Sequence, residues 1–261
     1  MTIFQTFRLV VNESVTGKNE RITSIDDLKY PSKAVVQKIN RNNRANTPTS
    51  NMFYSAQNID AALKEVRPPV NKLVTVGVWK PRINKKFAAF PISHSEKAAQ
   101  VNDGVAKATN SLESYEYYSS PLILKFMRYY FTALGSEYSK PVNHNNHNEY
   151  LISALFSERL FEKYQIQVGS NLVDFQYDCI IYPSVGFKYQ TDNLAIRPDV
   201  LDNDFKLVKV IEFEVETEFY DNENTYVLKH PELITLAKVK NYCTTDLIDN
   251  MEGVIYWKWC N

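Results

Sequence analysis

The sequence lacks an excess of charge of either sign. It holds 30 lysine and arginine residues against 30 aspartate and glutamate residues, so its formal net charge at neutral pH is zero. A domain that binds the phosphate backbone of nucleic acid usually carries a surplus of basic side chains. Direct binding of nucleic acid is therefore not expected.

Long apolar runs are also missing. The stretch MTIFQTFRLVVNE has an arginine inside its only apolar run and lacks the small-residue cleavage pattern that follows a signal sequence. No segment approaches the roughly 20 consecutive apolar residues that span a bilayer. We therefore expect no contact with a membrane and a cytoplasmic location.

Cysteine and glycine are scarce. Cys179, Cys243 and Cys260 are widely separated and form no CxxC pair, which argues against a disulfide framework and against a zinc site. No other metal-binding pattern stands out, so no metal is expected. With only 7 glycines, the chain has little from which to build a flexible linker. The economical interpretation is a single domain that spans residues 1–261.

Segments with strand and helix periodicity are both present, which predicts the α+β class. The expected strands cover residues 4–11, 72–81, 175–184, 210–219 and 253–259. Along 210–219 apolar residues alternate with four glutamates, which we interpret as the solvated face of a half-buried strand.

Two helices are expected at residues 121–134 and 149–164, and Gly135 is predicted to end the first of them. The polar stretch 93–120 reads as a long excursion with a short helix around 95–109. Excursions of this length in compact domains are often lids or binding loops.

Residues 41–68 predict a loop, a short strand and a helix in succession. Arg44 falls on the loop, Tyr54 on the strand and Glu65 on the helix, which Asn58 or Asp60 can cap. We expect the three side chains Arg44, Tyr54 and Glu65 to converge.

Several short motifs occur in a characteristic order between about residues 4 and 198. They are FRLV near the start, RAN at 44–46, FYSA at 53–56, LKEVRP at 63–68, EYLISA at 149–154, YDCIIYPS at 177–184, and Asn193 within DNLAI. This series resembles the RES-domain family, toxins of bacterial toxin–antitoxin systems that degrade NAD. The family often has glycine where Asn43 stands and a proline–glycine pair where TPTS follows Asn46. A β-rich carboxy-terminal extension of about 199–261 is not covered by the resemblance.

The resemblance implies an ADP-ribosyltransferase-like fold, with mixed or antiparallel curved sheets around an NAD cleft and flanking helices. It implies an NAD glycohydrolase or phosphorylase that needs no cofactor beyond NAD as its substrate, and a cognate antitoxin as partner. A protein ADP-ribosyltransferase is the alternative activity. A catalytically silent RES-like binding module is the alternative of another class, and homo-oligomerisation stays open.

The chemistry of NAD cleavage gives each residue in the series a role. Nicotinamide leaves as a neutral molecule, so one carboxylate that stabilises the oxocarbenium-like state can suffice, and Glu65 is assigned to it. Arg44 would grip the pyrophosphate, Tyr54 would stack on the nicotinamide ring, and Ser184 would bind the carboxamide or orient Arg44. The NAD-binding set is completed by Asn46, Asn193 and Arg8.

Each of these residues also has an ordinary structural interpretation. Glu65 can be a solvated side chain paired with Lys64 or Arg67, and Arg44 a surface loop residue. Ser184 can simply form a turn after a proline. Asp178 offers a second catalytic carboxylate, or else it anchors a turn.

Overall fold

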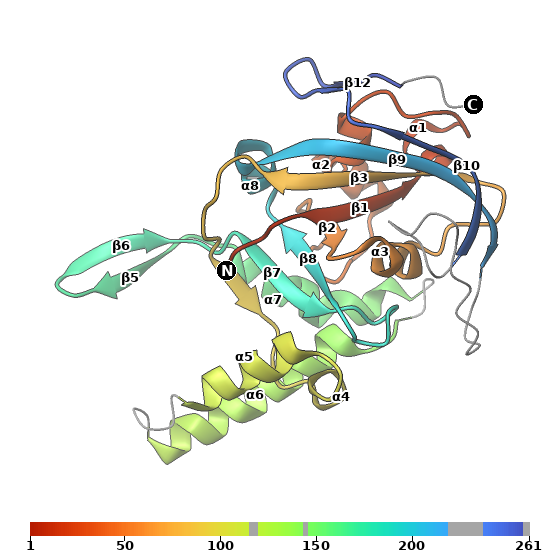
Figure 1. The fold of residues 1–261 in the computed structure, drawn as a ribbon. Coiled ribbons are helices and arrows are strands. Elements are labelled where there is room, and N and C mark those ends of the chain that lie inside the picture. Colours follow the sequence, from red (N-terminus) through yellow and green to blue (C-terminus); the bar gives the residue numbers. More distant parts are fainter. Residues whose placement is uncertain (115–119, 143–145, 219–236, 258–261) are drawn as a thin grey trace. The chain divides into compact units, whose positions relative to one another are not determined.

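The computed structural model describes residues 1–114, 120–142, 146–218 and 237–257 (Figure 1). The chain forms two compact units. The helical unit comprises Met1–Thr2, Pro31–Phe53 and Lys86–Val200. The sheet unit comprises Ile3–Tyr30, Tyr54–Lys85 and Leu201–Asn261.

Five strands of the described chain build the sheet of the sheet unit, in the order β10, β9, β3, β1, β2, and each neighbouring pair is antiparallel. They are β1 (Thr6–Val11), β2 (Phe53–Ala56), β3 (Leu73–Pro81), β9 (Phe205–Glu218) and β10 (Ala237–Thr245). Val76 pairs with Leu9 on one side and with Ile211 on the other. Val76, Ile211 and Phe213 are fully buried, so these strands carry the core. The strands predicted at 72–81 and 210–218 are confirmed, and the one predicted at 4–11 begins at Thr6; residue 219 lies outside the described part of the chain.

Short elements surround this sheet. They are α1 (Asn12–Thr16), the 3-10 helix η1 (Asp26–Leu28), β11 (Ile248–Asp249) and β12 (Val254–Ile255). Of the strand predicted at 253–259, only β12 is formed, and residues 258–259 lie outside the described part of the chain.

Helix α3 (Ile59–Val66) follows β2 and packs on β1. Its first turn is capped by Asn58, whose side chain accepts a hydrogen bond from Ala61 N at 2.7 Å; of the two cap candidates, Asn58 and Asp60, the structure uses the first. Ile59 and Leu63 are buried on one face. The helix ends at Arg67, which has a left-handed φ of 49°.

The interpretation of the β9 glutamates as a solvated face is wrong for Glu212. This side chain is 1% exposed, and its Oε1 accepts a hydrogen bond from Arg21 Nε at 2.7 Å. Asn12 Nδ2 lies 3.4 Å from the other carboxylate oxygen, so Asn12 and Arg21 cover this position on the sheet. Glu214 and Glu216 are partly exposed, in line with the prediction.

The described part of the helical unit holds mostly helices. They are α2 (Lys33–Ile39), α4 (Glu96–Ala99), α5 (Asp103–Glu113), α6 (Pro121–Ser139), the 3-10 helix η3 (His147–Tyr150) and α7 (Leu151–Leu160). Helix α8 (Pro198–Asp204) contains the point at which the chain passes into the sheet unit.

Among the described residues of the helical unit, three strands pair side by side and two others form a separate hairpin. β7 (Cys179–Pro183) pairs antiparallel with β8 (Asp192–Ile196) and parallel with β4 (Ala89–Pro91). β5 (Tyr164–Val168) and β6 (Asn171–Phe175) form the hairpin, which the sequence analysis did not predict. The strand predicted at 175–184 is confirmed only for Cys179–Pro183.

The prediction that Gly135 ends a helix is wrong, because α6 continues to Ser139. A Cβ atom at Gly135 would clash with the carbonyl oxygen of Ser93 and lie 3.0 Å from Ser95 N. Glycine therefore serves here for close packing of the 93–95 segment on the helix. The start of α6 follows the expected pattern, with Ser120 as N-cap and Pro121 in the first turn.

The polar stretch 93–120 contains two helices, α4 and α5, where a single short helix at 95–109 was predicted. Asn102 caps α5 by accepting hydrogen bonds from Gly104 N and Val105 N. Residues 115–119 lie outside the described part of the chain.

Helices and strands together confirm the α+β class. Among the described helices, none has the length and apolar character needed to cross a bilayer. Cys179 is buried and free, whereas Cys243 is disulfide-bonded, which the scattered cysteines did not lead us to expect.

Candidate functional site

The residues predicted to bind and cleave NAD are divided between the two units. The helical unit holds Arg44, Asn46, Ser184 and Asn193. The sheet unit holds Arg8, Tyr54 and Glu65. The expected convergence of Arg44 with Tyr54 and Glu65 therefore stays a prediction, and each group is described within its own unit.

Arg44 caps the carboxy-terminal end of helix α6. Its side chain is buried, and Nη1 donates hydrogen bonds to the carbonyl oxygens of Tyr138 at 2.6 Å and Glu137 at 3.3 Å. Nη2 donates to the carbonyl oxygen of Lys140 at 3.2 Å. Carbonyls at this end of a helix lack intrahelical partners, and the helix dipole favours a cation beside them. Arg44 is therefore fixed in place by a structural role.

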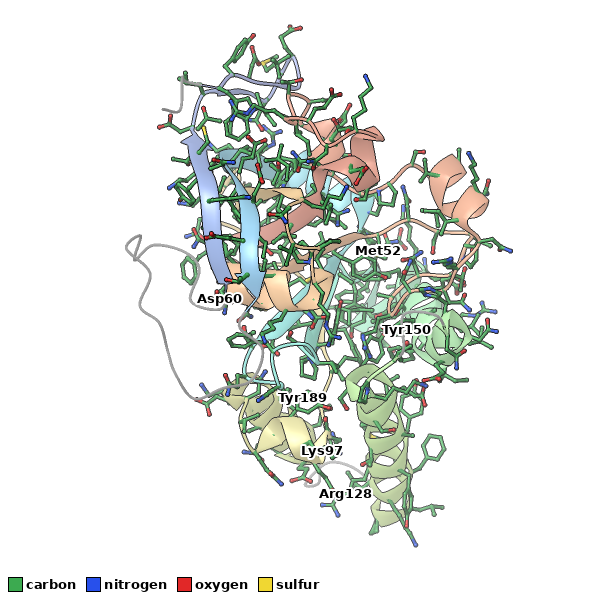
Figure 2. The ribbon with its side chains drawn as sticks, turned by 90° about the vertical axis from the view of Figure 1, so that its right-hand side faces the viewer. Met52, Asp60, Lys97, Arg128, Tyr150 and Tyr189 are labelled. Carbon is green, nitrogen blue, oxygen red and sulfur yellow. The ribbon has the colours of Figure 1, made fainter. Side chains whose placement is uncertain are left out.

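Aromatic rings complete the surroundings of Arg44. The guanidinium carbon lies 4.9 Å from the centre of the Tyr150 ring, labelled in Figure 2, and 6.0 Å from that of Tyr182. These distances fit cation–π attraction. Tyr189, also labelled in Figure 2, donates its hydroxyl to the carbonyl oxygen of Ser139 at 3.0 Å and so assists in capping α6. The three hydrogen bonds of Arg44 use three of the five donors of a guanidinium.

The loop that carries Arg44 is closed by backbone and side-chain bonds. Asn43 N donates to the carbonyl oxygen of Asn46 at 2.9 Å. The amide of Asn46 is 1% exposed and donates to the carbonyl oxygens of Thr47 and Ser50, both at 2.8 Å. Asn46 is thus used to shape the turn after Arg44.

Glu158 on α7 anchors the same loop, and the sequence analysis missed it. Its Oε1 accepts hydrogen bonds from the hydroxyls of Thr47, of Thr49 at 2.8 Å and of Ser50 at 2.9 Å. Burial raises the pKa of Glu158, but the hydrogen bonds from these hydroxyls outweigh it and hold the pKa below its usual value. The run of hydroxyl residues after RAN was the available signal, since such a run can surround one carboxylate.

Ser184 directly follows β7, and Asn193 lies on the neighbouring strand β8. Ser184 is fully buried, and its hydroxyl accepts a hydrogen bond from Phe187 N at 3.3 Å. Asn193 is 4% exposed and pairs across the ladder with Tyr182, whose ring faces Arg44. The helical unit thus brings Arg44, Ser184 and Asn193 into one neighbourhood around Tyr182.

Asp178 anchors the start of β7. Its Oδ2 accepts a hydrogen bond from Ala88 N at 2.8 Å, next to the β4 strand, and its Oδ1 lies 3.9 Å from Arg197 Nη2. Of the two interpretations of Asp178, these contacts support the structural one.

In the sheet unit, Arg8 is linked to the strand that carries Tyr54. Arg8 Nη1 donates to the carbonyl oxygen of Tyr54 at 3.0 Å. Burial lowers the pKa of Arg8 to about 10, and the nearby Tyr54 opposes this shift. The side chain therefore stays cationic at neutral pH and places a positive charge beside β2.

Glu65 lies in the last turn of α3, and its side chain is partly exposed. It shares the sheet unit with Arg8 and Tyr54, on a helix that contacts β1. Its orientation depends on α3, which is fixed by the Asn58 cap and by the buried apolar face described above.

The helical unit also contains a cavity of about 620 Å³. It is lined in part by Met52, Glu158, Phe161, Arg197 and Asp199. Its volume falls in the usual range for small-molecule sites. None of the seven residues predicted to bind or cleave NAD lines it.

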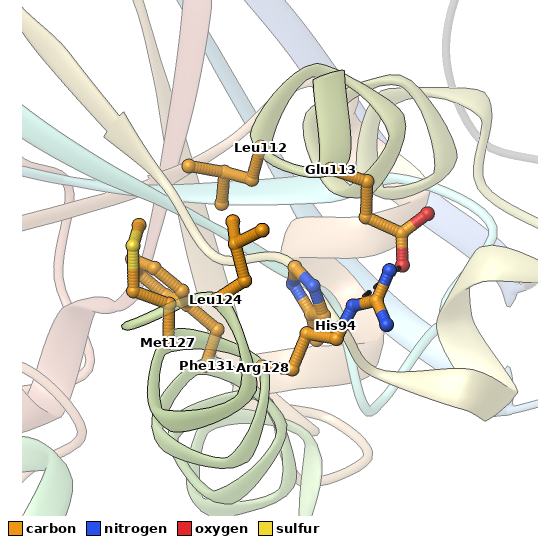
Figure 3. A pocket seen from close by; sticks show the side chains of 7 residues that line it. All are labelled: His94, Leu112, Glu113, Leu124, Met127, Arg128 and Phe131. Atoms are coloured by element: carbon orange, nitrogen blue, oxygen red, sulfur yellow. Dashed lines mark ion pairs between the residues drawn. The ribbon is translucent and has the colours of Figure 1, made fainter. Parts of the chain in front are cut away.

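A second cavity lies between α5 and α6, beside His94 (Figure 3). Its volume of about 10 Å³ leaves room for one water molecule. His94 stacks on Phe131, and Arg128 forms an ion pair with Glu113 at 4.0 Å across the rim. This space is too small for a nucleotide.

The described residues offer no group of three or more histidine, cysteine, aspartate or glutamate side chains that could hold a metal ion. No family model matches the chain, and no curated protein or solved structure matches it either. The family resemblance therefore depends on the ordered motifs themselves.

Proposed function

We propose that the protein cleaves the bond between nicotinamide and ribose in NAD and passes the ADP-ribose to water or phosphate. The observation that carries this proposal is the ordered series of Arg44, Tyr54, Glu65 and Ser184, each within a motif that resembles the RES-domain family. With it we propose an ADP-ribosyltransferase-like arrangement of the fold and a cognate antitoxin as partner.

Glu65 is the proposed catalytic carboxylate. As the bond from C1′ to the nicotinamide nitrogen breaks, its electron pair moves to the nitrogen, and positive charge grows on the ribose. A carboxylate beside the ribose stabilises that charge, and the oxygen of water or phosphate then bonds to C1′. With water as acceptor, the products are nicotinamide, ADP-ribose and one proton.

Arg44 is the proposed partner of the pyrophosphate. Its guanidinium is held by the carbonyls of α6 and by the ring of Tyr150, so it needs little reorganisation to receive an anion. Three of its five donors are used on α6, and a bidentate contact to phosphate needs two. Arg44 can therefore cap α6 and bind the pyrophosphate at the same time.

The remaining residues have proposed contacts with the substrate. Tyr54 would stack on the nicotinamide ring and Ser184 would bind its carboxamide. Arg8 brings positive charge near Tyr54, which suits the anionic part of NAD. Asn46 and Asn193 are buried beside Arg44 and Tyr182 and would act mainly by holding the proposed binding residues in position.

Incubation of the purified protein with NAD tests the proposal. We expect loss of NAD and release of nicotinamide, both measured by chromatography. A chelator is present throughout, because the proposed reaction needs no metal ion. Glu65→Gln should lower the rate by about a hundredfold to a thousandfold while NAD binding is largely kept, because the amide retains the shape but loses the charge.

The matched control is Glu252→Gln, the same change at an exposed residue of the sheet unit, which should leave the rate unchanged. Intact NAD after prolonged incubation with folded wild-type protein would refute cleavage and favour the silent binding module. A wild-type rate for Glu65→Gln would assign the catalytic carboxylate elsewhere.

A further inference from the structure

A row of aromatic side chains crosses the helical unit, and none of them is buried. Successive ring centres lie 4.9 to 6.3 Å apart. The row runs through Tyr164, Phe175, Tyr177, Phe90, Phe156, Tyr130 and Phe126. Each of these residues is intermediate or exposed. Aromatic rings usually gather in the core of a protein or in an interface.

Large apolar side chains flank the row on three elements. Helix α6 exposes Leu122 at 78%, Phe126 at 70% and Tyr129 at 67%. The others are Ile123 on α6, Leu151, Ile152 and Leu155 on α7, and Val168, Leu172 and Val173 on the hairpin. We call the row and these residues the α6–hairpin surface. Contiguous apolar patches of this kind mark interaction sites on folded proteins.

The β5–β6 hairpin gives an independent reason to expect a partner. It is a separate two-stranded sheet that projects away from the rest of the helical unit (Figure 1). Two-stranded hairpins are marginal in water unless another element covers them. Val168, Leu172 and Val173 are about half exposed, so the described parts of this chain leave the hairpin uncovered.

The charges on this surface fit a second copy of the chain. Along the hairpin from Tyr164 to Phe175 the sequence has a single charged residue, Asp174, which is acidic. The exposed first half of α6 has no acidic residue; it carries Lys125, and also Arg128, which forms the ion pair with Glu113 of α5. In a symmetric pair each copy presents the same surface, so the hairpin of one copy can lie on α6 of the other with opposite charges opposed.

The area is also sufficient. A stable interface buries about 800 Å² on each partner. A dozen large apolar side chains that are about half exposed offer on the order of 1,000 Å². We propose that the α6–hairpin surface is the interface of a symmetric homodimer in which the β5–β6 hairpin of each copy packs on α6 of the other.

Sedimentation velocity and light scattering of the full chain test the proposal. The wild-type protein should have the mass of two chains, and Phe126→Glu and Leu122→Glu should each give the mass of one. Both substituted residues are mostly exposed, so circular dichroism melting should be unchanged in the monomer apart from the loss of concentration dependence.

The matched control is Phe4→Glu, which makes the same change at a phenylalanine that is 82% exposed in the sheet unit. This variant should stay dimeric. A monomeric wild-type protein at a concentration of about 100 μM, far above a micromolar Kd, would overturn the proposal. So would a dimer that persists in Phe126→Glu.

Charge exchange tests the pairing of hairpin with α6. Asp174→Lys and Lys125→Asp should each weaken association by roughly tenfold or less, and the double variant should recover much of the loss. Failure of the double variant to recover, with wild-type dimers present, would refute this arrangement. If the chain is monomeric alone and associates only with a different protein, the surface belongs to that partner and the homodimer is refuted.

Discussion

At the scale of single residues, the proposed site depends on side chains that do no chemistry. Glu158 holds Thr47, Thr49 and Ser50, and thereby the loop that carries Arg44. Sequence reasoning could find the Asn58 cap, because a cap and its helix are adjacent in the chain. Glu158 lies 111 positions from Thr47, so no local pattern could pair them.

The first residue-scale prediction concerns Glu158→Gln. The folded-state pKa of Glu158 is lowered, so its stabilisation is present above the unfolded pKa and is lost as pH falls through the folded value. The variant should unfold more easily than wild type by about 1 kcal/mol at pH 7, a figure reduced for partial exposure. The difference should shrink as the pH falls below about 4.

Denaturant melts at several pH values measure this difference. Glu162→Gln is the control, because Glu162 is 58% exposed and its side chain forms a surface ion pair with Arg159 at 2.9 Å. The free energy of unfolding of that variant should differ from that of wild type by no more than about 0.3 kcal/mol. An equal loss for Glu158→Gln at pH 3 and pH 7 would contradict the assignment of the stabilisation to the carboxylate.

Glu212→Gln should behave in the opposite way. Burial raises the pKa of Glu212, although Arg21 and Asn12 oppose the shift. A raised folded-state pKa means that wild-type stability, relative to the neutral variant, is greatest below the unfolded pKa and falls as pH rises through the folded value. The stability of Glu212→Gln relative to wild type should therefore increase as pH rises from about 4 to 8. A variant that instead loses stability over that range would show that the Arg21 pair dominates.

At the scale of secondary-structure elements, the apolar runs in the sequence predicted the strands β1, β3 and β9 because most of their residues enter the core. The β5–β6 hairpin was missed because it has no buried face. Its residues are almost all exposed, so alternation along it reports no buried face. The end of α6 was misplaced because the sequence alone does not distinguish a glycine needed for close packing from a glycine that ends a helix.

The element-scale prediction is therefore made at Gly135. Gly135→Ala adds a methyl group against the carbonyl oxygen of Ser93 and close to Ser95 N. The backbone at Ser93 cannot change its rotamer, as a flexible side chain could, so the whole 93–95 segment must move away from α6. We expect a loss of about 2 kcal/mol or more in the free energy of unfolding, despite the better helix propensity of alanine.

Ala133→Gly is the comparison for Gly135→Ala. Ala133 is exposed on the same helix, and its change should cost about 1 kcal/mol through helix propensity alone. Chemical denaturation of both variants gives the two values. A Gly135→Ala protein as stable as wild type would show that the Ser93 carbonyl is not in contact with α6.

At the scale of the whole molecule, the two units are interleaved along the chain. The sheet unit takes its residues from three separate stretches, and β9, from the segment after residue 199, lies between β3 and β10. A search for a linker rich in glycine or proline could not reveal such units, because the chain passes between them several times. The proposed NAD-binding residues are likewise drawn from both units.

The whole-molecule prediction is the fate of the ADP-ribose. An ADP-ribosyltransferase would need a surface that recognises its target protein, and the polar stretch 93–120 could provide it; its described part forms α4 and α5, and Ser93 packs against Gly135 of α6. A neutral net charge also gives no long-range attraction for a macromolecular target. With NAD labelled in its ADP-ribose part and a cell extract, we expect the label in free ADP-ribose or its phosphate. Label attached to one extract protein, and lost with Glu65→Gln, would instead establish the protein as an ADP-ribosyltransferase.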